Sequence, residues 1–369
     1  MKDTVLKVGG TPYEMGLAHG SAVAASVRQY AEERVRLATA ASWTGRGADR
    51  AEVMELAAAC LQVHEERYPH LTEELRGVAA GAGVNPATLV VSGGFTDFVD
   101  AVAAGALSGP PGSPSPATLS EDDCTALLVP RSRMADDLPA LAQTWDMHEG
   151  SADHLLLLEG RPAGRPAFIV MTTSGCLGMI GINEAGVCVG INNLTAAGGR
   201  VGVTWPFVVR AMLEQETAEA ALEALRAAPL AGGHNYLVVD AAGRGANVEA
   251  MPDAIAETTL ADEVLVHTNH CLSEETRRVE RPREAMSQTE SERRLTRALE
   301  LSRRSDLDVD YLQSVTADPD AVCRVGVPPS HVGTCGAVVM RPATREMWAV
   351  TGRPSQAPYE RYRLGEPAR

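Results

Sequence analysis

The residue with the most obvious chemical potential is Cys124, which lies between a flexible stretch and an apolar run. Residues 104–123 are rich in proline, glycine and serine, and residues 126–129 have the character of a strand. If the chain is cut between Asp123 and Cys124, the cysteine gains a free α-amine. Such an amine has a pKa of about 8 and can accept the thiol proton, so one residue would supply both nucleophile and base. The alternative is a buried cysteine that begins a core strand.

Several other segments accompany Cys124 in a recognisable order. They are Gly10–Gly16 with His19-Gly20, Asp123-Cys124-Thr125, Gln143–Asp146, Gly181–Val187 with Gly190–Asn193, His234–Leu237 and His267–His270. Together these segments resemble the motifs of the acyl-CoA:6-aminopenicillanate (isopenicillin N) acyltransferase family, a branch of the N-terminal-nucleophile hydrolases. The resemblance spans about residues 10 to 270.

This resemblance implies a fold and a reaction. The fold would be α+β, a four-layer αββα sandwich with two antiparallel sheets between helices. The precursor would cleave itself at Asp123-Cys124, and the two fragments would stay associated. The mature protein would then be a cysteine hydrolase or acyltransferase that acts on a small N-acyl amine or amide through an acyl-enzyme on Cys124.

The resemblance also implies roles for individual residues. Cys124 would be the nucleophile, and the carboxylate of Asp146 would orient its freed α-amine. The side-chain amide of Asn269 would donate a hydrogen bond to the oxyanion of the transition state. Thr125 and Asn235 are weaker candidates for contacts with substrate.

Two positions depart from the family pattern. The branches that cleave N-acylethanolamines, ceramides or bile-salt amides carry an arginine three residues before the catalytic aspartate, whereas this sequence has Gln143. The residue before the expected cut is Asp123, where the penicillin acyltransferase has a small residue. A lipid or bile-salt amidase is therefore disfavoured, and the rate of processing is open.

A metal site is the first alternative chemistry. His267, His270 and Cys271 are close in sequence, but on a strand the two histidines would point to opposite faces. A helical pair would need a further acidic or histidine ligand. The sequence also lacks a phosphate-binding glycine loop, and Ser174-Gly175-Cys176 lacks the complete elbow of a serine hydrolase. We therefore expect neither a metal nor another cofactor.

The spacing of apolar residues and the positions of glycine and proline then predict the helices and strands that must position these residues. The N-terminal segment, residues 1–103, favours helices at 12–38, 51–68 and 72–80. Residues 104–123 are the linker, and residues 124–369 form the expected core. Within that core we expect strands at 126–129, 141–146, 155–159, 167–172, 179–182, 187–192, 235–240, 246–249, 264–268, 336–341 and 347–351. We expect helices at 205–214, 217–227, 289–303 and 309–315, and an enlarged turn at 131–139.

Charge and composition exclude some partners. The chain of 369 residues has 33 basic and 48 acidic residues, a net charge of −15. A nucleic-acid binder needs a basic surface, and an anionic membrane would repel this chain. Residues 274–304, dense in arginine and glutamate, are expected to form a solvated helix face with a loop before it. The seven cysteines show no disulfide-like spacing, and the N-terminus lacks a signal-peptide pattern, so a cytoplasmic location is expected.

Two functional hypotheses follow from these observations. The first is the self-processing enzyme, whose partners would be a small-molecule amide or acyl donor, with acyl-CoA as one candidate, and its own cleaved N-terminal fragment. The second is an unprocessed or non-catalytic relative that acts as a binding or assembly protein and retains Cys124 for packing. The sequence does not separate hydrolysis from acyl transfer, because both proceed through the same acyl-enzyme.

Overall fold

The structure is a computed structural model that describes residues 5–107, 123–328 and 331–365. Most of the expected linker, residues 108–122, lies outside the described residues. None of the described helices combines the length and the apolar character that a membrane span requires.

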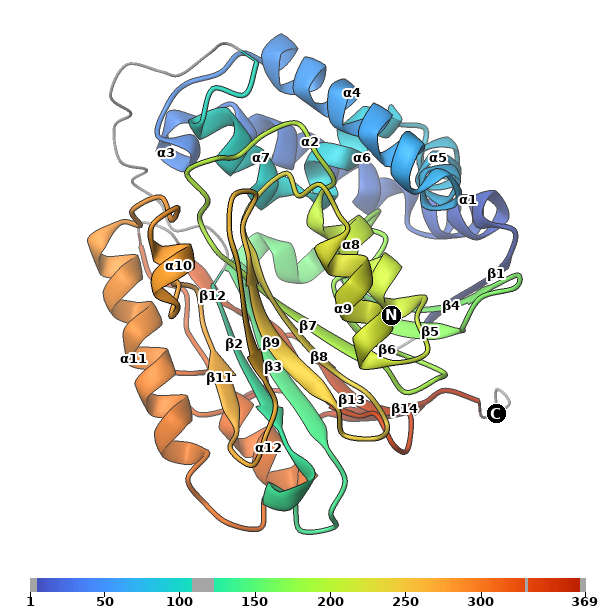
Figure 1. Cartoon of the computed structure of the whole chain (residues 1–369). Coiled ribbons are helices and arrows are strands. Elements are labelled where there is room, and N and C mark those ends of the chain that lie inside the picture. The colour runs from blue at the N-terminus through green and yellow to red at the C-terminus, as the bar shows by residue number, and fades with distance from the viewer. Residues whose placement is uncertain (1–4, 108–122, 329–330, 366–369) are drawn as a thin grey trace.

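The larger sheet, sheet A, runs across the middle of the molecule (Figure 1). In the described residues its order is β1 (Leu6–Gly10), β4 (Leu155–Pro162), β5 (Phe168–Thr173), β6 (Ile180–Asn183), β7 (Cys188–Asn193), β8 (His234–Val239), β9 (Gly245–Ala250) and β10 (Ile255–Thr259). The pairing of β1 with β4 is parallel, and the pairings from β4 to β10 are antiparallel.

The second sheet, sheet B, carries the start of the expected core. Its order in the described residues is β11 (Leu265–His267), β2 (Asp123–Val129), β3 (Ala140–His148), β12 (Val332–Arg341), β13 (Glu346–Thr351) and β14 (Glu360–Arg363), and these pairings are all antiparallel. The connection from β2 to β3 contains a short 3-10 helix at Arg131–Arg133, in the region where the enlarged turn was expected.

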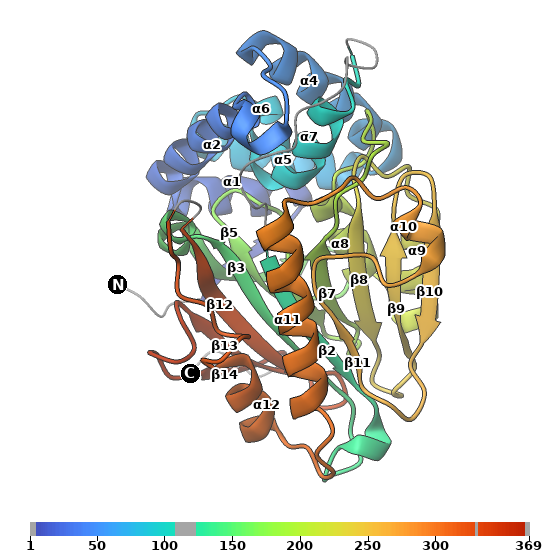
Figure 2. The ribbon, with the colours of Figure 1, turned by 90° about the vertical axis from the view of Figure 1, so that its left-hand side faces the viewer.

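Helices cover the outer face of each sheet. Helices α8 (Trp205–Leu213) and α9 (Ala218–Arg226) pack on sheet A, while α11 (Ala285–Leu301) and α12 (Val309–Thr316) pack on sheet B. Figure 2 shows α11 and α12 lying along the strands of sheet B. The four-layer αββα sandwich expected from the sequence is confirmed.

The N-terminal helices gather at one end of the sandwich (Figure 1). They are α1 (Pro12–Ala22), α2 (Ala24–Ala38), α3 (Ala41–Thr44), α4 (Arg50–Arg67), α5 (Pro69–Ala82), α6 (Pro86–Gly93) and α7 (Phe95–Ala103). A buried ion pair joins this end to the sandwich. Arg210 of α8 donates to both carboxylate oxygens of Glu74 of α5, at 2.7 and 2.9 Å, and both side chains are buried. Because Glu74 precedes the expected cut and Arg210 follows it, the pair would link the two fragments.

Some boundaries differ from the sequence-based expectations. The single helix expected at 12–38 is wrong: it breaks at Val23, whose backbone (φ −125°, ψ 31°) leaves the helical region. The short strands β1, β10 and β14 were not anticipated, because they lie at sheet edges and carry few buried side chains. The remaining short elements are α10 (Glu274–Arg277) and a 3-10 helix at residues 149–154.

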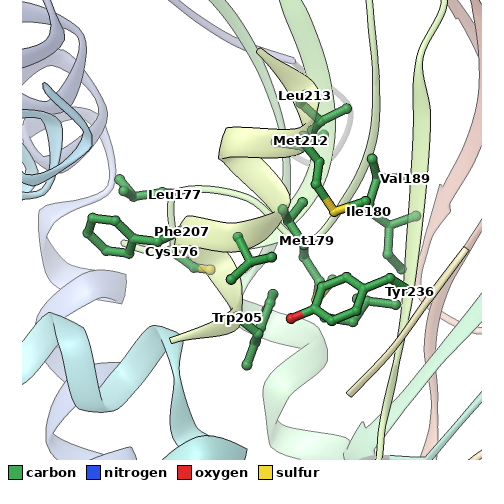
Figure 3. Close-up of a cluster of buried hydrophobic side chains, with 14 of the residues drawn as sticks. Cys176, Leu177, Met179, Ile180, Val189, Trp205, Phe207, Met212, Leu213 and Tyr236 are labelled. Carbon is green, nitrogen blue, oxygen red and sulfur yellow. The ribbon is translucent and has the colours of Figure 1, made fainter. Parts of the chain in front are cut away.

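The main core fills the space between sheet A and its covering helices as well as the space between the sheets. Figure 3 shows the part beneath α8, where Trp205 and Met212 of that helix lie toward Ile180 and Tyr236 of sheet A, while Phe207 points to the other side and stacks on His64 of α4. These side chains are almost completely withdrawn from solvent. The covering helix is therefore fixed to the sheet by apolar contacts.

Strand β2 contributes to two separate cores. Cys124, Ala126 and Leu128 belong to the main core between the sheets, whereas Leu127 and Val129 belong to the core beneath α11 and α12. Successive side chains of a strand point to opposite faces, so this alternation follows from the strand itself. The Cys124 side chain is thereby directed between the sheets, and its neighbours in the chain are directed toward α11.

Helices α1 and α5 approach so closely that only glycine fits between them. A Cβ atom on Gly16 would lie 1.9 Å from the carbonyl oxygen of Glu74, and one on Gly20 would lie 2.1 Å from that of Val78. Gly77 and Gly81 of α5 face α1 in the same way. The glycines of the N-terminal motif therefore have a packing function.

We predict that Gly16→Ala destabilises the protein by about 1–3 kcal/mol, because the new methyl group forces the two helices apart. This loss should appear even though alanine is the better helix former. The control is Gly47→Ala, whose Cβ would meet nothing within 4 Å. Urea unfolding of both variants measures the effect, and equal midpoints would contradict it.

Candidate active site

Cys124 lies near the beginning of β2, in the interior of the protein. Its side chain is in the main core, it is 2% exposed, and its register partner on β3 is Trp145. Its backbone N–H donates to Oδ1 of Asn269 at 2.7 Å. Asn269 follows β11, the neighbour of β2, so strand pairing brings together two residues that are 145 positions apart.

Asn269 is held in one orientation by its other contacts. Its Oδ1 also accepts from Nη2 of Arg294 at 3.0 Å, and its Nδ2 donates to the carbonyl oxygen of Asn193 at 3.1 Å. Its backbone N–H donates to Oγ of Ser291 at 2.9 Å. With Asp123 and Cys124 still joined, the Asn269 amide nitrogen is therefore directed at Asn193.

Three arginines surround the carboxylate of Asp123, and we refer to them as the arginine trio. Oδ1 of Asp123 lies 3.0 Å from Nη2 of Arg294 and 3.2 Å from Nη2 of Arg283, and Oδ2 accepts from Arg324. Asp123 is completely buried. Burial raises the pKa of this carboxyl group, but the charges of the arginine trio outweigh that effect and hold the pKa below its ordinary value.

The arginine trio corrects one expectation from the sequence. Residues 274–304 were expected to form a solvated face, but Arg294 is completely buried, and the side chain of Arg283 is 3% exposed. A signal for this was present in the helix pattern. Ser287, Ser291, Arg294 and Ala298 recur at helical spacing and form the buried stripe of α11, so small residues leave room for the guanidinium.

Asp146 lies opposite Asp123 in the pairing of β2 with β3. Its Oδ1 accepts from Oγ1 of Thr334 at 2.7 Å, and its buried Oδ2 has no hydrogen-bond partner among the described residues. Burial raises the pKa of Asp146 to about 6, and the charges of Arg294 and Arg324 offset this only in part. The carboxylate is thus beside the Asp123-Cys124 backbone with one oxygen unused.

Thr125 and Asn235, the weaker candidates for contacts with substrate, lie in different surroundings. Thr125 faces α11, where its Oγ1 accepts from Nη1 of Arg294 at 3.3 Å, so its side chain is on the opposite side of β2 from the Cys124 thiol. Asn235 is part of sheet A. Its Nδ2 donates to Oδ1 of Asn192 at 3.1 Å and to Oδ1 of Asn247 at 2.8 Å.

Gln143 joins the two sheets. Its Oε1 accepts from the backbone N–H of Ile191 at 3.0 Å, and its Nε2 donates to the carbonyl oxygen of the same residue. A Cβ on Gly190 would lie 2.6 Å from that Oε1, so the neighbouring glycine makes room for the amide. At the position where the related amidases carry arginine, this chain has a neutral connection between the sheets.

The histidines considered as metal ligands have other partners. Nε2 of His267 lies 2.9 Å from Oε1 of Glu249, and Nδ1 of His270 lies 2.7 Å from Oγ of Ser291. In the described part of the chain, no group of three or more His, Cys, Asp and Glu side chains is arranged to hold a metal ion.

Comparisons with known proteins agree with the resemblance seen in the sequence. The model of the family described as acyl-coenzyme A:6-aminopenicillanic acid acyl-transferase matches residues 133–356, more than half of the chain. The acyl-coenzyme A:6-aminopenicillanic-acid-acyltransferase 40 kDa form of Emericella nidulans is 26% identical over 265 residues, which cover 71% of this chain and 68% of that protein.

Two solved structures are also similar. A mutant of the conjugated bile acid hydrolase from Clostridium perfringens has a TM-score of 0.48 and 10% identity, over 66% of this chain and 93% of that chain. Penicillin V acylase from Agrobacterium tumefaciens has a TM-score of 0.38 and 12% identity, over 65% of this chain and 86% of that chain.

The raised pKa of Asp146 makes stability depend on pH. Its carboxyl group binds a proton more tightly in the folded chain than in the unfolded chain, where the pKa is near 3.8, so its contribution is lost as the pH rises through about 6. In the Cys124→Ala chain, Asp146→Asn should therefore gain ~2 kcal/mol over its parent between about pH 4 and pH 8. Urea unfolding at both pH values measures the gain.

The matched control for this measurement is Asp262→Asn, which removes an exposed carboxylate. Its difference from the parent should change little over the same pH range. If Asp146→Asn behaves in the same way as the control, Asp146 does not titrate at the raised pKa.

Proposed function

The chain belongs to the acyl-coenzyme A:6-aminopenicillanic acid acyltransferase family, and from this premise we propose that it is a self-processing cysteine enzyme that hydrolyses or transfers a small acyl group. The general kind of reaction, acyl transfer or amide hydrolysis, follows from the family and its relatives. The proposal adds the nucleophile, the cleavage site and the residues that assist them.

The observation that carries the proposal is the environment of the Cys124 nitrogen. This atom would become the general base after cleavage, and it already donates to Oδ1 of Asn269 at 2.7 Å. A base acts only when it is held at a fixed distance from the proton that it removes. The contact with Asn269 would hold the nitrogen in place. It can persist after cleavage, because a free amine still has N–H groups to donate.

In the proposed processing step, Sγ of Cys124 attacks the carbonyl carbon of Asp123. The bond between that carbon and the Cys124 nitrogen breaks, the nitrogen takes up a proton, and a thioester links the Asp123 carbonyl to Sγ. Water then hydrolyses the thioester. The products are a carboxylate on Asp123, a free thiol and a free α-amine on Cys124.

Turnover would repeat this chemistry with an external substrate. The α-amine accepts the thiol proton, Sγ attacks the substrate carbonyl, and the leaving group takes the proton as its bond to the carbonyl breaks. Water or an amine then attacks the thioester and restores the thiol. The buried carboxylate of Asp146 would favour the protonated α-amine, because opposite charges attract strongly where water is excluded.

The proposed partners are a small-molecule amide or acyl donor and the cleaved N-terminal fragment. The contact of Gln143 with Ile191 supports a substrate other than the lipid and bile-salt amides, since no arginine charge is offered at that position. A cytoplasmic location remains part of the proposal and is supported by the cysteines, all of which are free thiols.

Processing can be tested by electrophoresis under denaturing conditions. The native sequence should give two bands, of about one third and two thirds of the 39.0 kDa mass, and Cys124→Ala should give one intact band because no thiol can attack Asp123. Cys60→Ala, which removes a buried cysteine of α4, is the control and should still be cleaved. A single band from the native sequence would favour the binding or assembly protein instead.

The role of Asn269 can be tested by kinetics. Asn269→Ala should lower kcat by about 100- to 1,000-fold with KM little changed, because it removes both the acceptor that would fix the α-amine and the amide proposed as oxyanion donor, and both act mainly in the transition state. Self-cleavage should slow as well, since it passes through the same kind of oxyanion. The measurement uses mature enzyme collected after prolonged incubation. An unchanged kcat would remove Asn269 from the site and leave Asn235 as the next candidate.

A further inference from the structure

Self-cleavage makes Asp123 the first acyl group that the enzyme handles. In the thioester proposed above, the acyl group on Sγ of Cys124 is the aspartyl group of residue 123. The carbonyl of an external substrate must reach the same sulfur atom, so the space that the Asp123 side chain occupies in the uncut chain is open to its acyl chain once Asp123 has left. The surroundings of that side chain therefore report on the acyl group of the substrate.

Those surroundings are strongly cationic. The Asp123 carboxylate is completely buried, and each member of the arginine trio lies within ion-pair distance of it. Other carboxylates also interact with the arginine trio: Asp146 with Arg294 and Arg324, Glu290 with Arg324, and Glu280 with Arg283. If the Asp123 carboxylate leaves after cleavage, each of the three largely buried guanidinium groups loses an ion-pair partner, and removing one partner of a buried ion pair is costly.

Arg283 has binding capacity that the uncut chain does not use. Its side chain is 3% exposed, and its Nε and Nη1 have no hydrogen-bond partner among the described residues. The same arginine lines a cavity of about 360 Å³, whose wall also includes Arg277, Gln288 and the two acidic residues Glu280 and Glu292. The arginine trio thus adjoins open space on the side of Arg283, where a ligand can enter.

We propose that the acyl group of the substrate is an ω-carboxyacyl group of the succinyl type, and that the arginine trio binds its carboxylate. This inference rests on the function proposed above and names its substrate class. In an aspartyl group, two carbon atoms separate the reacting carbonyl from the side-chain carboxylate. A succinyl group has the same spacing, a malonyl group is one carbon shorter, and a glutaryl group is one carbon longer.

The chemistry of the substrate step is unchanged by this assignment. Sγ of Cys124 forms a thioester with the succinyl carbonyl as the leaving group departs with the proton from the α-amine. Water or an amine then releases succinate or a succinyl amide and restores the thiol. The distal carboxylate takes no part in bond making, and it fixes the carbonyl near Sγ through charge-assisted hydrogen bonds.

The test compares three thioesters of N-acetylcysteamine that differ only in the acyl group: succinyl, monomethylsuccinyl and butyryl. The self-cleaved enzyme is incubated with each, and the released N-acetylcysteamine is quantified by chromatography. The succinyl thioester should have a kcat/KM about 10- to 100-fold above the two neutral thioesters, the range expected for a charge-assisted contact.

A pair of variants ties the preference to the arginine trio. Arg283→Gln should reduce the ratio of succinyl to butyryl turnover by about 10-fold or more, since it removes a charge that faces the carboxylate. Arg278→Gln removes an equal charge from an exposed side chain and should leave the ratio as it is. The acyl series with the native sequence decides the question even if Arg283→Gln fails to fold.

Each result bears on one of the two proposals. A self-cleaved enzyme that uses butyryl as well as succinyl overturns the ω-carboxyacyl assignment and leaves the proposed function intact. A self-cleaved enzyme that uses none of the three also overturns the assignment, because the succinyl thioester offers both an activated carbonyl and the carboxylate. A chain that neither cleaves itself nor uses any thioester overturns the proposed function.

Discussion

An ionised carboxylate persists in a protein interior only if positive charge surrounds it, and the region around Asp123 is built to meet that requirement. The arginine trio comes from three places: Arg294 from α11, Arg283 from the segment just before that helix, and Arg324 from the segment before β12. One carboxylate at the start of β2 therefore links the outer helix layer to sheet B, in addition to the apolar core that α11 and α12 share with that sheet. Arg294 extends the same network to Asn269 and the carbonyl oxygen of Cys124.

The alternation of β2 separates two tasks that belong to neighbouring residues. Cys124 faces the space between the sheets, while Asp123 and Thr125 face the helix layer with its arginines. A shift of one residue in the pairing of β2 with β3 would exchange these environments, placing a carboxylate in the apolar core and the thiol among the guanidinium groups. The bonds of Asn269 to the Cys124 nitrogen and to Arg294 oppose such a shift.

Local pattern and family resemblance differ in what they could predict. Helix α4 and the central strands were predictable from the spacing of apolar residues and from the flanking glycines and prolines, because their buried faces are long and regular. The meeting of Cys124 with Asn269 was accessible only through the resemblance, since no local rule joins residues so far apart. The burial of Arg283 and Arg294 was missed because arginine side chains normally face water, and what buries these two is a partner on a distant strand.

The buried pair of Glu74 with Arg210 and the parallel pairing of β1 with β4 both cross the expected cut. A cut chain would keep these contacts. Breaking them would leave two buried charges without their partners and expose the unpaired edge of β4. Its unfolding, however, would change in molecularity. One intact chain folds in a unimolecular reaction, whereas two fragments must find each other at a rate that depends on their concentration. The processed protein would then fold readily as the uncut chain before cleavage. After cleavage and unfolding, its two fragments would refold only slowly.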